Sequence, residues 1–82
     1  MTDLELDNAL KNILENGGRY RQNVFASFED MYNHLLTEEE RLPRGGHEFW
    51  WQWKLEWRVS ALRKKGVIKP KEESGIGFWE LA

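Results

Sequence analysis

The segment from His47 to Lys65 constrains the fold most, because one predicted helix contains four of the chain's five tryptophans. At 100° per residue, its apolar residues form two stripes on opposite sides. One stripe holds Trp51, Leu55, Val59 and Leu62, and the other holds Trp50, Trp53, Trp57 and Ala61. We expect the first stripe to face the core. The second stripe packs either beneath the first helix or against Phe78 and Trp79, or it is an exposed apolar patch that binds a partner.

Polar residues separate these stripes and suggest a nucleic-acid interface. Lys54, Arg58 and Lys65 share one flank of the predicted helix, and Gln52, Glu56 and Arg63 share the other. Cationic side chains on one flank can pair with DNA phosphates, and a glutamine can read an adenine edge. The candidate DNA-binding residues are Arg44, Gln52, Lys54, Arg58, Lys65, Lys69 and Lys71. The alternative is that these residues are an ordinary solvated surface.

Two more helices are predicted before this segment. Residues 2–5 read as a capping box that starts a helix from Asp3 to Asn16, ended by the glycine pair 17–18. A second helix is expected over Ser27–Leu36, burying Phe28, Met31, Tyr32 and Leu35. Residues 19–25 are either a brief strand or the lead into that helix. Residues 37–40 form a second capping box, whose glutamates are expected to be solvated.

The C-terminal residues predict a hairpin. Val67–Lys69 is one short strand, residues 70–75 are a turn, and Ile76–Leu81 is the returning strand. Three helices followed by a two-stranded hairpin form a winged helix, so the predicted fold class is α+β, mostly α, in a single domain covering residues 1–82.

Charge and composition limit the function classes. The net charge is −2, but residues 1–40 carry nine acids and three bases, whereas residues 41–82 carry five acids and nine bases. This asymmetry indicates an anionic partner for the second half. There is no cysteine, no signal peptide and no long apolar run, which favours a cytoplasmic location. His34 and His47 have no metal-ligand spacing and no catalytic motif is present, so we expect no metal, no cofactor and no enzyme activity.

Three segments carry a family resemblance. Residues 36–45 (LTEEERLPRG), 57–68 (WRVSALRKKGVI) and 77–81 (GFWEL) are similar, in order and spacing, to the winged-helix domain at the N-terminus of Mrr-type restriction endonucleases. The resemblance implies a DNA-binding accessory domain, which that family joins to a nuclease or another effector domain.

Two functions follow from these patterns. The first is a non-catalytic domain that binds double-stranded DNA through the 47–65 helix and the hairpin, in a restriction-type or regulatory system. The alternative is a protein-interaction module on the same fold, in which Trp50, Trp53 and Trp57 contact a protein partner or a second copy of the chain.

Overall fold

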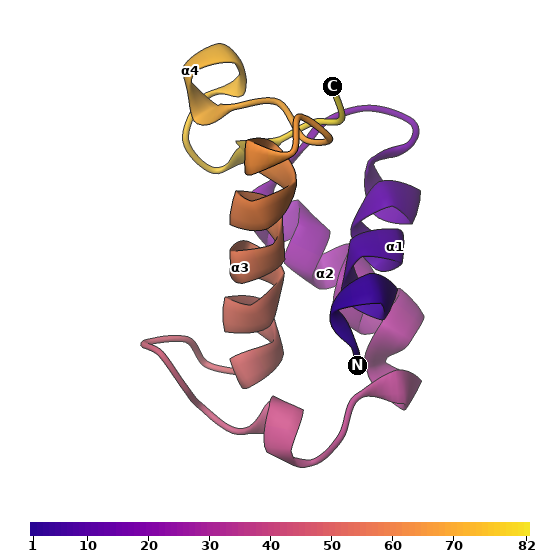
Figure 1. The fold of residues 1–82 in the computed structure, drawn as a ribbon. Coiled ribbons are helices and arrows are strands. Elements are labelled where there is room, and N and C mark those ends of the chain that lie inside the picture. Colours follow the sequence, from indigo (N-terminus) through magenta and orange to yellow (C-terminus); the bar gives the residue numbers. More distant parts are fainter.

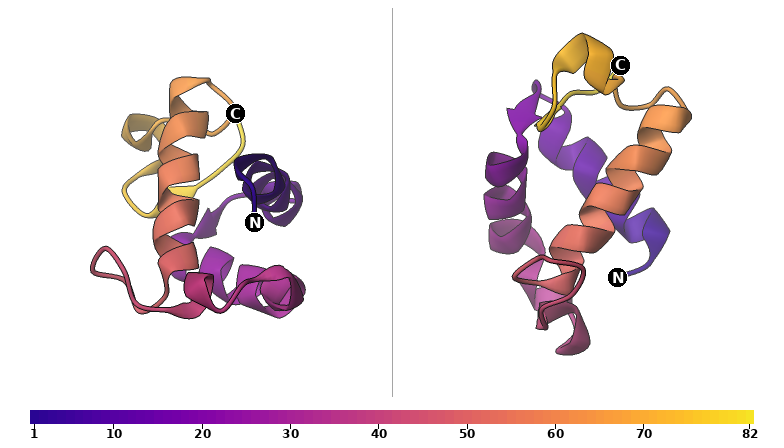
Figure 2. Two further views of the ribbon diagram at one scale, coloured as in Figure 1. Left: turned by 60° about the horizontal axis from the view of Figure 1, so that its bottom comes forward. Right: turned by 90° about the vertical axis from the view of Figure 1, so that its left-hand side faces the viewer.

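The computed structural model describes all 82 residues as a mostly helical α+β domain. Its elements are α1 (Asp3–Leu14), β1 (Arg19–Tyr20), α2 (Arg21–Tyr32), the 3-10 turns η1 (Asn33–Leu35) and η2 (Glu39–Arg41), α3 (Trp50–Lys64), α4 (Lys71–Ser74) and β2 (Phe78–Trp79). Helices α1, α2 and α3 surround the core, and the C-terminal segment closes one end of the bundle (Figures 1 and 2).

Helix α1 begins at Asp3, as its sequence predicts, and ends at Leu14, two residues before the predicted end. The Thr2 hydroxyl accepts a hydrogen bond from the Glu5 amide, and the Glu5 carboxylate accepts one from the Thr2 amide. This capping box satisfies two amides that have no partner inside the helix. The residues that turn inward are Leu6, Ala9, Leu10, Ile13 and Leu14, and all of them are buried.

Helix α2 differs from the prediction. It begins at Arg21 rather than Ser27, and the chain passes into a 3-10 turn after Tyr32. The earlier start turns Val24 and Phe25 inward with Phe28. The expected burial of Met31 and Leu35 was therefore wrong, because their residues are 44% and 46% exposed.

Helix α3 brings its inner stripe into the centre of the core. Trp51, Leu55, Val59 and Leu62 are all buried, as the periodicity predicts. The Trp51 ring stacks on Phe28 with centroids 5.0 Å apart and meets Phe25 edge-on at 5.6 Å. The helix starts at Trp50 instead of His47, because His47 pairs with Arg44 in an isolated bridge that closes the 44–47 turn.

The C-terminal segment pairs with two parts of the chain. Strand β2 lies antiparallel to β1, with Arg19 opposite Trp79 and Tyr20 opposite Phe78. The predicted hairpin partner, Val67–Lys69, is joined to the returning chain by one bridge between Ile68 and Leu81 and by a bond from the Lys69 amide to the Glu80 carbonyl. The connection between them contains the single turn of α4. Residues 19–25, predicted as either a brief strand or the lead into the second helix, contain both: residues 19–20 form β1, and α2 begins at Arg21. Strand β1 is therefore the main partner of the returning chain.

Candidate functional site

The four stripes predicted for α3 are all present, but they have different surroundings. The inner stripe is buried in the core. One polar flank, Lys54 and Arg58, faces α1 and the 37–41 turn. We call the side opposite the buried inner stripe the outer face and define it as Trp53, Trp57, Ser60 and Lys64, which follow one another along the exposed side of the helix.

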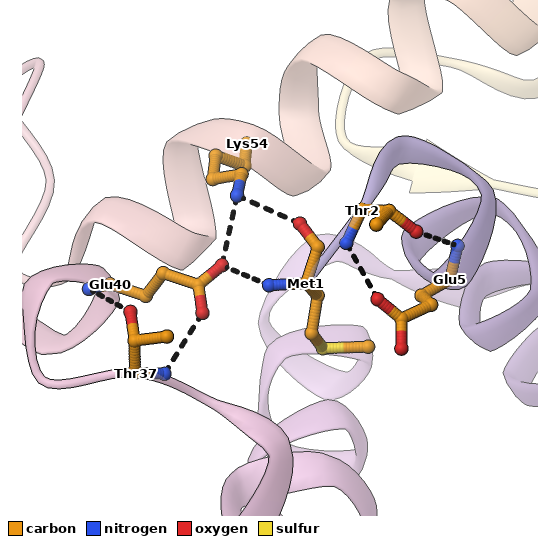
Figure 3. Close-up of polar contacts among 6 residues, drawn as sticks. All are labelled: Met1, Thr2, Glu5, Thr37, Glu40 and Lys54. Atoms are coloured by element: carbon orange, nitrogen blue, oxygen red, sulfur yellow. Dashed lines mark hydrogen bonds and ion pairs between the residues drawn. The ribbon is translucent and has the colours of Figure 1, made fainter.

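Lys54 is held in a polar cluster with Glu40 and the N-terminus (Figure 3). Its Nζ donates to Glu40 Oε2 at 2.8 Å and to the Met1 carbonyl oxygen at 3.0 Å. The Met1 ammonium group donates to the same Glu40 oxygen at 2.7 Å. The other oxygen, Oε1, accepts from the Thr37 amide at 2.9 Å, so the second capping box is also confirmed.

Glu40 is the buried centre of this cluster. The residue is 2% exposed, so the expectation of a solvated glutamate at this position was wrong. Burial alone raises the pKa of Glu40, but hydrogen bonds from Lys54, the Met1 ammonium and the Thr37 amide outweigh burial and lower the pKa to about 2. The carboxylate is therefore ionised wherever the protein is folded near neutral pH.

Arg58 is engaged in a second ion pair, with α1. Its Nε and Nη2 donate to the two carboxylate oxygens of Asp7 at 2.7 and 2.9 Å, and Nη1 lies 3.4 Å from Asp3. The bidentate hydrogen bond to Asp7 raises the pKa of Arg58. The guanidinium group thus connects α3 to α1 rather than projecting into solvent.

The other predicted DNA-binding residues are spread over the molecule. Gln52 accepts a hydrogen bond from the Phe49 amide at 3.3 Å and caps α3. Lys69 pairs with Glu80 at 2.9 Å, and this hydrogen bond raises the pKa of Lys69. Arg44, Lys65 and Lys71 are exposed and belong to no ion pair. The structure therefore does not bring the predicted residues together into one open basic surface.

Trp50 differs from the other two tryptophans of its predicted stripe. The Arg44 guanidinium lies 4.6 Å from its ring centroid and Lys54 Nζ lies 5.0 Å from it, both within cation–π range. Its indole nitrogen is buried without a hydrogen-bond partner. Trp50 thus contacts two cations of the domain through its ring and is part of the domain's own structure.

Trp53 and Trp57 form a ridge on the outer face. Their rings meet edge-on with centroids 5.6 Å apart, and Trp57 is 59% exposed. On one side of this ridge lies a groove of about 510 Å³, lined by both ridge residues with Asp3, Trp50, Lys54, Arg58 and Ala61. On the other side is a smaller hollow bounded by Glu56 and Ser60. A ridge between two hollows is the shape that interlocks with the side chains of another protein element.

Two sets of polar contacts made by α3 were not predicted from the sequence. Glu56 bridges Arg21 and His47, with oxygen–nitrogen distances of 2.9 Å to each. Arg63 donates to the carbonyl oxygens of Lys69 and Phe78 at 3.0 and 3.1 Å and fastens the C-terminal segment to α3. These partners lie outside α3, so its periodicity gave no signal for them.

Comparison with known proteins adds no relative: no protein-family model, no curated protein and no solved structure gives a significant match to this chain. None of the helices combines the length and apolar character required to span a membrane. No group of three or more histidine, aspartate or glutamate side chains is arranged to hold a metal ion.

Proposed function

We propose that this chain is a non-catalytic domain of the winged-helix type that binds a protein partner through the outer face of α3. The order of elements supports the fold type. A winged helix has a short strand between its first two helices, and β1 lies between α1 and α2 and pairs with β2. The segment before α4 also runs beside the returning chain, as the strands of a wing do.

The observation that carries the functional proposal is the exposure of Trp57 beside Trp53. A domain with one small core gains stability by burying each large aromatic ring. Trp57 is nevertheless 59% exposed, next to a groove with an apolar lining. Exposed aromatic clusters on monomeric proteins mark interaction sites, and tryptophan is enriched among the residues that dominate binding energy.

The ion pairs favour a protein over DNA as the partner. Lys54 and Arg58 were the central cations of the predicted DNA interface, and both are bound to carboxylates inside the domain. Moving Arg58 to a phosphate would leave Asp7 without its only cationic partner, and moving Lys54 would remove one of the two cationic partners of Glu40. Such an exchange gives little net gain, because breaking a partly buried ion pair is costly.

Site-specific photo-crosslinking tests the proposal. A benzophenone amino acid is placed at position 57 or, as the control, at Met31 on α2, which is also exposed and apolar but lies outside the outer face. Both proteins are irradiated in the cells that produce them. We expect a discrete protein adduct from position 57 and none from position 31. Equal adducts from both positions, or none from either, contradict the proposal.

DNA binding is the second candidate function, and a specific observation favours it. Arg44, Lys64, Lys65 and Lys71 are exposed and have no acidic partner. Arg44 lies before α3, whereas the three lysines lie at or beyond its C-terminal end. Phosphate contacts at both ends of a helix are compatible with docking on a duplex, and the resemblance to the Mrr-type domain points the same way. Such binding has to weaken steeply as salt increases.

A further inference from the structure

We infer that the outer face of α3 binds an amphipathic helix of another protein, whose apolar stripe is flanked at both ends by acidic residues. This inference rests on the proposed function and adds the chemistry of the partner. Binding a helix in a groove is a common recognition mode, in which side chains three, four and seven residues apart anchor the contact.

The dimensions of the face fit a helix. Trp53 and Trp57 are four residues apart and lie above one another on the same side of α3. From Trp50 to Lys64 the helix spans about 21 Å, since each residue rises about 1.5 Å. The groove beside the ridge is bounded on its far side by Asp3 at the start of α1, so two elements form its walls. The lining of the groove follows α3 from Trp50 to Ala61, so about three turns of a partner helix can lie along it.

Charges at the two ends of the face select the partner. Arg44 is fixed at the N-terminal end by its contact with Trp50, and Lys64 continues the line of Trp53 and Trp57 at the C-terminal end. Neither cation has an acidic partner within the domain. The charges that border the middle of the face are already paired within the domain: Asp3 with Arg58, and Glu56 with Arg21 and His47. Acidic residues are therefore favoured at the ends of the partner helix, whereas its middle is held by apolar contact with Trp53 and Trp57.

The same charges disfavour a second copy of the chain. In a two-fold symmetric pair, the same surface is used on both subunits. If the two α3 helices run antiparallel, Arg44 of each copy lies near Lys64 of the other. If they run parallel, each cation faces its own counterpart. Either arrangement brings like charges together, whereas a helix with acidic ends pairs with both cations.

A displayed library of helices tests the inference. Each peptide has about 18 residues, enough for about 27 Å of helix. It carries a fixed leucine stripe, and glutamate, lysine or serine is allowed at the end and middle positions. Selection uses the wild-type domain, and binders retained by the Trp57→Ala variant are discarded. We expect the selected helices to carry glutamate at both ends and to show no charge preference in the middle. We also expect Arg44→Glu/Lys64→Glu to weaken them by at least about tenfold.

Three results would overturn the inference. Selected helices without a charge preference would show that the outer face binds helices by apolar contact alone, and the proposed function would stand. Failure to select any Trp57-dependent helix would remove the helix as occupant, while crosslinking from position 57 tests the proposed function separately. A dimer in sedimentation experiments that Trp57→Ala dissociates would make a second copy the occupant.

Discussion

Two sides of α3 carry cationic side chains, and the two sides differ in whether a carboxylate faces those cations. On the flank toward α1, Lys54 meets Glu40 and Arg58 meets Asp7, with every nitrogen–oxygen distance below 3 Å. On the outer face, Lys64 meets no carboxylate and stands in line with the exposed Trp57. The flank holds the domain together, whereas the outer face is free to bind. Cations on one side of the helix are therefore used for stability, whereas on the other side we propose that they contribute to recognition.

The strongest test of this contrast removes Glu40. Glu40→Ala leaves the Lys54 and Met1 ammonium groups without their shared carboxylate, so we expect a loss of roughly 3–5 kcal/mol in the free energy of unfolding. Urea denaturation followed by circular dichroism measures it. The exposed neighbour serves as control, because Glu39→Ala should change stability by no more than about 0.5 kcal/mol. Equal effects of the two substitutions would mean that the cluster around Glu40 contributes nothing to the free energy of unfolding.

The pH dependence of stability tests whether Glu40 stabilises the fold as an ionised carboxylate. The pKa of Glu40 is lowered from 4.5 to about 2 in the folded protein, so folding favours its ionised form. Its contribution is complete above the unfolded-state pKa and is lost as pH falls from 4.5 toward about 2. We expect the stability gap between wild type and Glu40→Gln to be widest near neutral pH and to narrow below pH 4.5. A gap that does not change with pH would contradict an ionised Glu40.

A double-mutant cycle on Arg58 and Asp7 probes the second ion pair. The side chains are only 18% and 13% exposed, and the contact is bidentate. We expect a coupling free energy of roughly 1–2 kcal/mol from Arg58→Ala, Asp7→Ala and the double variant. A coupling near zero would leave Arg58 free to contact a ligand, and would return it to the DNA interface predicted from the sequence.

The smallest effect on stability is expected on the outer face. Trp57→Ala should cost less than about 1 kcal/mol, because the residue is 59% exposed. Trp51→Ala, which removes a buried tryptophan of the same helix, should cost roughly 3–5 kcal/mol. Thermal denaturation of both variants makes the comparison. Equal losses would indicate that Trp57 is part of the core, and the outer face would lose its main anchor.

The spacing of apolar residues was sufficient to predict the helices whose buried side is set by their own sequence. The buried stripes of α1 and α3 were predicted because each helix repeats its apolar residues at helical spacing. The start of α2 was missed because Tyr20, at its N-cap, makes no side-chain capping bond. Strand pairing between β1 and β2 joins segments of two residues each, which are too short to show a pattern.

Periodicity was less informative about the candidate site. It placed Trp50, Trp53 and Trp57 on one stripe, but the covering of Trp50 depends on Arg44 in the preceding turn. It placed Lys54 and Arg58 on one flank, but their partners Glu40 and Asp7 lie 14 and 51 residues away. Whether a cation forms an ion pair within the domain depends on such distant contacts. The spacing of residues within one helix cannot predict them.

The most direct test of the account is a titration of the domain with a fluorescent duplex of about 20 base pairs at low and moderate salt. Wild type is compared with Arg58→Ala and Trp57→Ala, each checked for folding by circular dichroism. We predict that wild type binds the duplex no more tightly than about 100 µM, the weak end of non-specific binding, and that neither substitution changes this. Micromolar binding that weakens with salt and is lost in Arg58→Ala would contradict the account and make α3 a DNA-binding helix.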